Sequence, residues 1–268
     1  MIKKVFLITQ FGKPHEWVEK YVENVQKLEQ SGWYWQIFTP NQIASKGNVQ
    51  IVPMTIERFA DLVGQKCGIK PNLYITPEGI PNFHVTEFYV YIGKILEDYT
   101  KGFDFWGMTG MDNLYGNLSD FIADHLLAQC DVFSDDVDTL NGNFSLWRNN
   151  ETINTLYTRL PYWKELLSQP DCEGCVTTGE ARLSTKHKLY SPEDLATEFL
   201  MKDIKFATPQ HYDLHGHDNL ENHELSLKDD GSLWELNPDI RGEHDTWGKT
   251  FGRQIAYYHF SKTKEWPI

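Results

Sequence analysis

The chain has 268 residues, 40% of them apolar, so it is long enough and apolar enough to bury a substantial core. Its formal charge of -13 at pH 7 repels nucleic-acid backbones, which excludes a general DNA-coating role and requires any nucleic-acid partner to meet a local basic patch. Four cysteines are too few for a disulfide-stapled secreted domain of this size.

The first part of the chain alternates strand and helix patterns. Residues 5–9 form a continuous apolar run that ends at Gly12 and Pro14, which is typical of a buried strand followed by a turn. The same criteria predict a helix over 17–28, strands over 33–38 and 49–52, and a helix over 55–63. This alternation predicts a parallel α/β sheet.

A second buried strand leads directly to an acidic residue. After a proline-rich loop over 71–81 and a helix over 86–99, residues 103–107 have the pattern of a buried strand that runs into Asp112. A carboxylate just past the carboxyl end of a central strand lies where open α/β sheets bind ligands. A helix is expected over 118–127 and a further strand over 142–149.

The C-terminal part differs in character, because six of the ten histidines lie from His211 onward. Residues 228–231 predict a hairpin turn between alternating segments. No signal peptide or membrane span is recognisable, which predicts a cytoplasmic protein. We expect one domain over 1–268, divided into a half over 1–118 and a half over 119–268 that carries a β-rich extension.

Asp112 and His259 are the candidate metal ligands. A hard divalent cation that keeps waters or phosphate oxygens in its other positions can be held by only one or two protein ligands. Asp112 follows a buried strand, and His259 has a strand-like setting far along the chain. Taken singly, an aspartate there is usually a turn or cap residue, and a lone histidine is usually structural.

Several blocks, taken in order, resemble a family of bacterial and phage GT-A-type glycosyltransferases. The first is Gln10-Phe11-Gly12, and the second is the segment 101–107 leading into Gly110-Met111-Asp112. The segment 142–149 and the closing Tyr258-His259-Phe260 complete the series. The resemblance implies a GT-A-like, Rossmann-type, mostly parallel sheet flanked by helices, with a nucleotide-sugar-binding half over 1–118 and an acceptor-binding half over 119–268. It also implies a hexosyl- or pentosyltransferase that transfers a sugar from a nucleotide-sugar donor, a uridine diphosphate sugar, with Mn²⁺ or Mg²⁺.

The resemblance also implies roles for individual residues. The residues assigned to the donor are Thr9, Gln10, Phe11, Gly12, Trp106, Gly110, Met111 and Lys262. Asp112 is assigned to catalysis and metal binding, His259 to metal binding, and Glu180 to the catalytic base of an inverting enzyme. Gly110 replaces the first acid of the family's Asp-x-Asp motif, and Asn143 replaces a histidine of the later block. These departures predict weak metal binding or a reaction without metal.

Alternative functions stay open at this level. The acceptor is either a glycan, as in polysaccharide biosynthesis, or a hydroxymethylated base in phage DNA, which has to be flipped out of its stack. A DNA acceptor predicts a basic strip made of Lys186, Lys188, Lys202, Lys205, Arg241, Lys249 and Arg253. Loss of the motif acid instead favours a catalytically silent nucleotide-sugar binder. The cluster from His211 to His217 fits a metal-dependent hydrolase.

Overall fold

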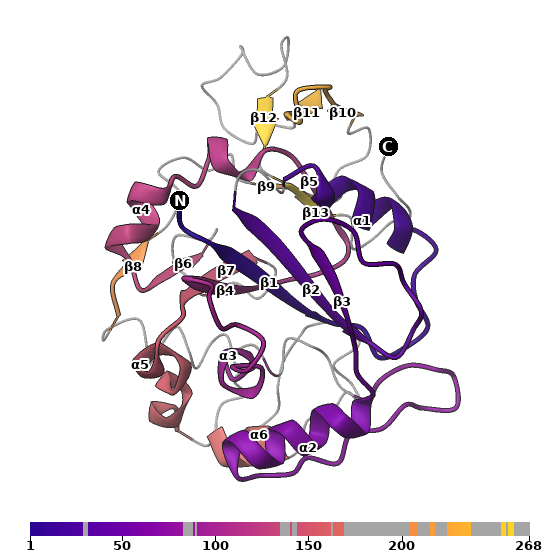
Figure 1. Ribbon diagram of the computed structural model, residues 1–268, viewed down its shortest axis with the longest axis vertical. Coiled ribbons are helices and arrows are strands. Elements are labelled where there is room, and N and C mark those ends of the chain that lie inside the picture. The colour runs from indigo at the N-terminus through magenta and orange to yellow at the C-terminus, as the bar shows by residue number, and fades with distance from the viewer. Residues whose placement is uncertain are drawn as a thin grey trace, which may run out of the picture.

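The computed structural model describes residues 1–28, 32–82, 88, 90–134, 140, 144–161, 163–168, 204–207, 215–217, 224–236, 253–255 and 257–259. They form a mixed α/β structure around one large sheet (Figure 1). Its strands, in spatial order, are β3 (Val49–Pro53), β2 (Trp33–Thr39), β1 (Lys4–Thr9), β4 (Phe105–Thr109), β7 (Phe144–Arg148), β6 (Val132–Ser134) and β8 (Phe206–Ala207).

The large sheet is mostly parallel. Strands β3, β2, β1 and β4 pair in parallel, and so do β6 and β8. Strand β7 pairs antiparallel with both of its neighbours, so it alone runs against the rest of this sheet. The predicted mostly parallel α/β sheet is therefore confirmed, with a reversed strand that the sequence pattern did not indicate.

Alternating residues of β1 supply the cores on both faces of the sheet. Val5 and Leu7 belong to a core shared with α2 (Ile56–Cys67) and α3 (Ile92–Ile95). Phe6 and Ile8 belong to a core shared with α1 (Val18–Gln26) and the short α4 (Asp124–Gln129). Because both faces are covered, the strand is a continuous apolar run without alternation.

Local chemistry fixes the helix ends. In α2, the Thr55 hydroxyl accepts a hydrogen bond from the Arg58 N–H at 3.2 Å, and Gly68, with φ of 74°, follows the last turn in the left-handed conformation. The remaining helices are α5 (Glu151–Asn154), α6 (Trp163–Ser168) and the 3₁₀ segments Leu118–Asp120 and Leu156–Arg159.

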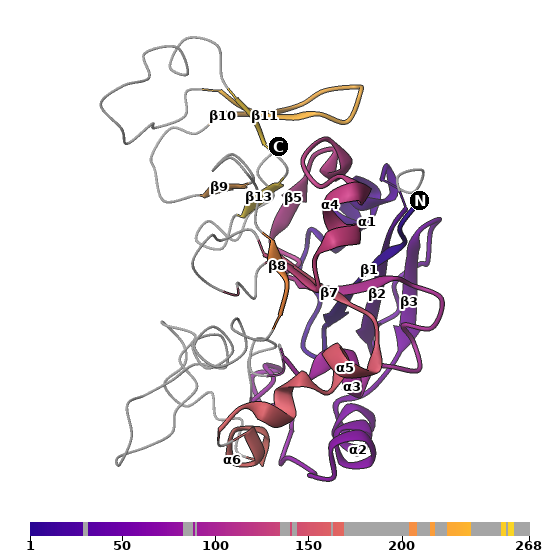
Figure 2. The same cartoon turned by 90° about the vertical axis from the view of Figure 1, so that its left-hand side faces the viewer.

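Strands of the C-terminal part of the chain form two small sheets, one of them together with β5 from the middle of the chain. One consists of β5 (Asn113–Tyr115), β13 (Tyr257–His259) and β9 (His215–His217), with β13 in the middle. The other consists of β10 (Glu224–Leu227), β11 (Leu233–Leu236) and β12 (Arg253–Ile255). The β10–β11 hairpin lies at the opposite end of the molecule from α2 (Figure 2). The hairpin predicted at 228–231 is confirmed, with Gly231 at φ of 84°.

Two predicted helices differ from the structure. The segment 118–127 is a 3₁₀ turn followed by α4, because Ala123 is extended, with φ of -76° and ψ of 145°, and interrupts the helix. Of the segment 86–99, the described residues contain only the four-residue α-helix Ile92–Ile95 and turns around it. In the described part of the chain, no helix combines the length and the apolar character that crossing a membrane requires.

Candidate functional site

The candidate site lies at the carboxyl ends of β1 and β4. The chain leaves β1 towards β2 on one side, whereas β4 packs on the other side of β1. Such a switch point opens a crevice at the strand ends where α/β proteins bind ligands. The β1–β4 register ends at the pair of Leu7 and Met108, and because the strands are parallel, Thr9 and Gly110 both follow towards the same edge of the sheet.

Helix α1 holds the segment that follows β4. The indole N–H of Trp17 donates to the Met111 carbonyl at 3.2 Å. Asn24 binds Tyr115 twice, because its amide N–H donates to the Tyr115 carbonyl at 2.8 Å and its Oδ1 accepts from the Tyr115 N–H at 2.8 Å. The turn that carries Asp112 is therefore fixed at both ends against a packed helix.

A buried polar group closes this turn. The Asn113 amide donates to the Thr109 hydroxyl at 2.7 Å, and that hydroxyl also contacts the Tyr115 hydroxyl. Thr109, Asn113 and Tyr115 are all buried. The end of β4 is thus tied to the start of β5, which fixes the backbone on either side of position 112.

The partly exposed Asp112 carboxylate lies over the backbone of Gly110, in the space where a Cβ atom at position 110 would be. Burial raises the pKa of Tyr115, and the Asp112 charge raises it further. The pKa of Tyr21 is raised by burial and, to a smaller extent, by Tyr115 and Asp112. A carboxylate held at the strand end thus lies close to two phenols that stay protonated.

Strand β13 brings His259 to the same place. In the β5–β13 ladder, His259 is the partner of Asn113, the residue next to Asp112. In the β13–β9 ladder, His259 is the partner of His217. The structure therefore brings together the backbone of Asp112 and that of His259, although the two residues are far apart in the sequence.

The β1 loop has the remaining donor candidates of the N-terminal part. The Gln10 N–H donates to the Phe38 carbonyl at 2.8 Å, and the Gln10 side-chain amide donates to the Lys13 carbonyl at 3.1 Å. Phe11 is buried against Phe59 of α2, with ring centroids 5.3 Å apart, so it packs in the core. At Gly12 a Cβ atom would lie 2.8 Å from the Gly79 carbonyl oxygen, so the 74–82 loop closes over this glycine.

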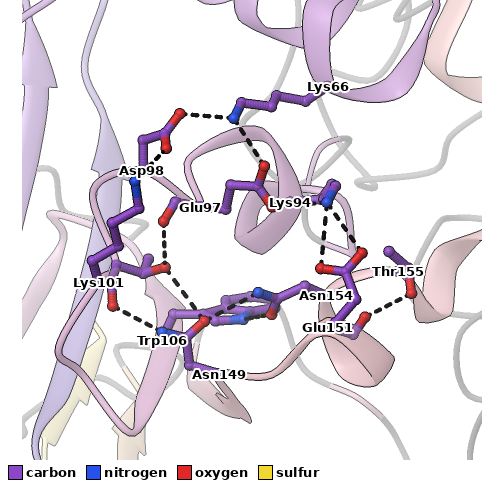
Figure 3. Close-up of polar contacts among 11 residues, drawn as sticks. Lys66, Lys94, Glu97, Asp98, Lys101, Trp106, Asn149, Glu151, Asn154 and Thr155 are labelled. Carbon is purple, nitrogen blue, oxygen red and sulfur yellow. Dashed lines mark hydrogen bonds and ion pairs between the residues drawn. The ribbon is translucent and has the colours of Figure 1, made fainter.

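Trp106, by contrast, lies in the core. It is fully buried, its ring stacks on Trp147 at 5.3 Å, and its indole N–H donates to Asn154 Oδ1 at 2.7 Å. Figure 3 shows it below a network of ion pairs that joins Lys66 and Lys94 to acidic groups of neighbouring segments. Its contacts indicate a structural role.

Several residues to which the resemblance gives a role lie outside the described part of the chain. Glu180 and Lys262 lie outside the described residues, as do Asn143 and most of the proposed basic strip, of which only Lys205 and the backbone of Arg253 are described. For His215, His217 and His259 the structure describes the backbone. Among the described side chains, no group of three or more His, Cys, Asp or Glu could hold a metal ion.

Three further residues, His15, Trp17 and Asn24, contribute to this region although no sequence pattern predicted a role for them. His15 stacks on Trp17 at 4.3 Å with an interplanar angle of 10°, and Trp17 in turn binds the Met111 carbonyl. The exposed His15 ring therefore lies near the turn that carries Asp112. Asn24 could have been recognised from the sequence, because asparagine is unfavourable in a helix interior unless its amide has a specific hydrogen-bond partner.

Comparisons with known proteins place the chain in a family without assigning it an activity. No curated protein matches the sequence. A family model matches residues 6–265, which is nearly the whole chain and includes every element of the candidate site. The chain belongs to this family, which is described as a family of unknown function (DUF6625).

Proposed function

We propose that the protein is a glycosyltransferase of the GT-A type, which moves a sugar from a nucleotide-sugar donor, a uridine diphosphate sugar, to an acceptor hydroxyl. The observation that carries this proposal is the pairing of His259 with Asn113, beside Asp112. Both residues were selected from the sequence for one shared role. Their convergence at the carboxyl end of β4, at the switch point of the sheet, supports that role.

The donor set at this edge fits a divalent cation. Asp112 would offer carboxylate oxygen and His259 would offer an imidazole nitrogen, both of which are ligands of Mn²⁺. Bound there, Mn²⁺ or Mg²⁺ would neutralise charge on the departing pyrophosphate. Thr9, Gln10 and Gly12 at the end of β1 would form the other wall of the donor site, with Gly110 and Met111 beneath the phosphates.

The chain's own residues have defined tasks in the transfer. The acceptor oxygen forms a bond to the anomeric carbon while the bond from that carbon to the diphosphate oxygen breaks, and the nucleotide diphosphate leaves with the electron pair. In an inverting reaction Glu180 takes the hydroxyl proton, whereas a retaining reaction requires no such base. His15, near Asp112, is placed to donate a hydrogen bond to the diphosphate.

A binding experiment tests the donor site directly. Uridine diphosphate is titrated into the full chain by calorimetry, with MnCl₂ and then with EDTA. Binding is expected with manganese and is expected to weaken with EDTA. Asp112→Asn should weaken binding about 100-fold, because it removes the charged metal ligand, whereas Asp61→Asn, which changes a surface carboxylate paired with Lys70, should match the wild type.

A turnover experiment then separates the functional alternatives. Uridine diphosphate sugars are incubated with neutral oligosaccharides or with DNA containing hydroxymethylcytosine, and products are identified by mass spectrometry. Sugar addition to either acceptor supports the transferase. Donor binding without transfer or hydrolysis would identify a silent binder, and absence of nucleotide binding, or binding unchanged in Asp112→Asn, would refute the proposed site.

A further inference from the structure

Exposed apolar side chains gather in one short segment of the chain. Among the residues that the structure describes, the large apolar side chains that are exposed are Met1 and, in the 74–82 loop, Tyr74, Ile75 and Ile80. Tyr74 is 49% exposed and Ile80 is 62% exposed. Exposed apolar side chains scattered singly are ordinary, whereas a group of them marks a contact surface. The proposed transfer reaction gives this surface no role.

The 74–82 loop is a closed β-hairpin. Ile75 and Pro81 form an antiparallel bridge. The Gly79 N–H donates to the Thr76 carbonyl at 2.9 Å, and the Thr76 N–H donates to the Ile80 carbonyl at 2.8 Å. Gly79 has φ of 83°, a left-handed conformation that glycine adopts without strain and that commonly closes hairpin turns. The backbone that carries Ile75 and Ile80 is therefore fixed.

The Asn82 side chain fixes the backbone at Tyr74. Its Oδ1 accepts a hydrogen bond from the Tyr74 N–H at 2.8 Å, and its Nδ2 donates to the Asn72 carbonyl at 3.0 Å. The Asn82 N–H also donates to the Tyr74 carbonyl at 3.0 Å. An aromatic side chain on a backbone ordered in this way binds a ligand without the cost of ordering a loop.

The hairpin lies against the loop that follows β1. The Gly79 carbonyl accepts a hydrogen bond from the Lys13 N–H at 3.4 Å, and it lies 2.8 Å from the position of a Cβ atom at Gly12. The Asn41 side chain binds the same loop, because its Nδ2 donates to the Gly12 carbonyl at 2.9 Å. Gly12 belongs to the donor wall proposed above. A molecule that docks on the hairpin would therefore lie beside the donor.

The chemistry of the hairpin favours an uncharged glycan as its occupant. A pyranose ring has a face of C–H bonds that packs on the partly negative face of an aromatic ring. The segment 71–82 contains a single charged residue, Glu78. A hydrogen bond from the Thr76 hydroxyl lowers the pKa of Glu78, so this carboxylate stays ionised at neutral pH. Its charge repels a phosphodiester backbone and opposes insertion into a bilayer.

We infer that the acceptor is a neutral glycan that docks on the 74–82 loop, with a pyranose ring stacked on the Tyr74 side chain. This inference rests on the proposed function for the role of the glycan as acceptor, but glycan binding itself can be measured without a donor. The glycan lies outside the space that the nucleotide occupies, so the two ligands bind together.

Glycan binding to the full chain tests the inference. The protein is screened without nucleotide on an array of neutral oligosaccharides, and the affinity for the strongest probe is measured by calorimetry. Tyr74→Ala should lower this affinity about tenfold, which corresponds to the loss of one aromatic stacking contact. Tyr74→Phe, the matched control, keeps the ring and should retain the affinity within about twofold. Both variants should bind uridine diphosphate with Mn²⁺ as the wild type does.

The inference would be overturned by the absence of binding to any neutral oligosaccharide, by equal affinity in Tyr74→Ala, or by displacement of the glycan by uridine diphosphate. Binding of hydroxymethylated DNA or of lipid vesicles that is lost in Tyr74→Ala, or a dimer lost in that variant, would assign the loop to another partner and overturn it too. Glycan binding that Tyr74→Ala weakens, in a protein that binds no uridine diphosphate, would uphold the glycan site and refute only the transferase.

Discussion

The Asp112 carboxylate occupies the space above Gly110 that any larger residue would need for its Cβ atom. Gly110→Ala should therefore displace the carboxylate and weaken uridine diphosphate binding about tenfold or more in calorimetry. Gly64→Ala is the control, since a Cβ atom there meets Lys70 at an ordinary 3.5 Å and alanine favours the helix. Unchanged binding in Gly110→Ala would show that nucleotide binding does not depend on the position of the Asp112 carboxylate.

Substitution of Trp106 should lower the stability of the protein, whereas substitution of Trp17 should lower its affinity for nucleotide. Trp106→Phe leaves the buried Asn154 amide oxygen without its donor, which should cost about 1–3 kcal/mol of unfolding free energy in urea. Its nucleotide affinity should not change, because the ring lies in the core. Trp17→Phe removes the bond to the Met111 carbonyl and should lower nucleotide affinity. If Trp106→Phe lowered nucleotide affinity and Trp17→Phe did not, Trp106 rather than Trp17 would be assigned to the donor site.

Lys4 and Asp124 form an ion pair whose partners differ in solvent exposure, with Nζ and Oδ1 2.6 Å apart. Lys4 is 1% exposed and Asp124 is 42% exposed, so only the carboxylate can be solvated after loss of its partner. Asp124→Ala should cost about 3–5 kcal/mol by leaving a buried ammonium unpaired. Lys4→Met should cost much less, and equal losses in urea denaturation would contradict this asymmetry.

Asp98 should give the fold a measurable acid sensitivity. Hydrogen bonds from Lys101 and then Lys66 lower the pKa of Asp98 from 3.8 to about 2 (Figure 3). A depressed pKa contributes stability that is complete above about pH 4 and is lost as the pH falls towards 2. Urea midpoints of the wild type should fall over this range more than those of Asp98→Asn. Because Asp98 is exposed, 0.5 M NaCl should shrink the difference, and identical pH profiles would exclude this contribution.

Local patterns predicted the strands well and the interrupted helices poorly. Strands 5–9, 33–38 and 49–52 are found where the sequence indicates them, because strands covered on both faces are continuous apolar runs. The periodicity of 118–127 continues through Ala123, and nothing local signals that this residue is extended. Helical spacing alone therefore overestimates helices where tertiary packing breaks them.

Only part of the candidate site could be predicted from the sequence. Asp112 could be placed at a strand end because a buried strand precedes it, but its position over Gly110 depends on the turn closed by Asn113 and Thr109. The pairing of His259 with Asn113, and of His217 with His259, depends on strands that meet only in the folded chain. No local periodicity encodes such long-range partners.

The central place of β13, between β5 and β9, has a consequence for biosynthesis. A ribosome releases the turn around Asp112 long before it releases residues 257–259, so the emerging chain can fold its first strands while this sheet still lacks its middle. The β5–β13–β9 sheet becomes complete only when residues 257–259 pair with the two strands that were released earlier. The sheet beside the Asp112 turn therefore stays incomplete until residues 257–259 have emerged and paired with β5 and β9.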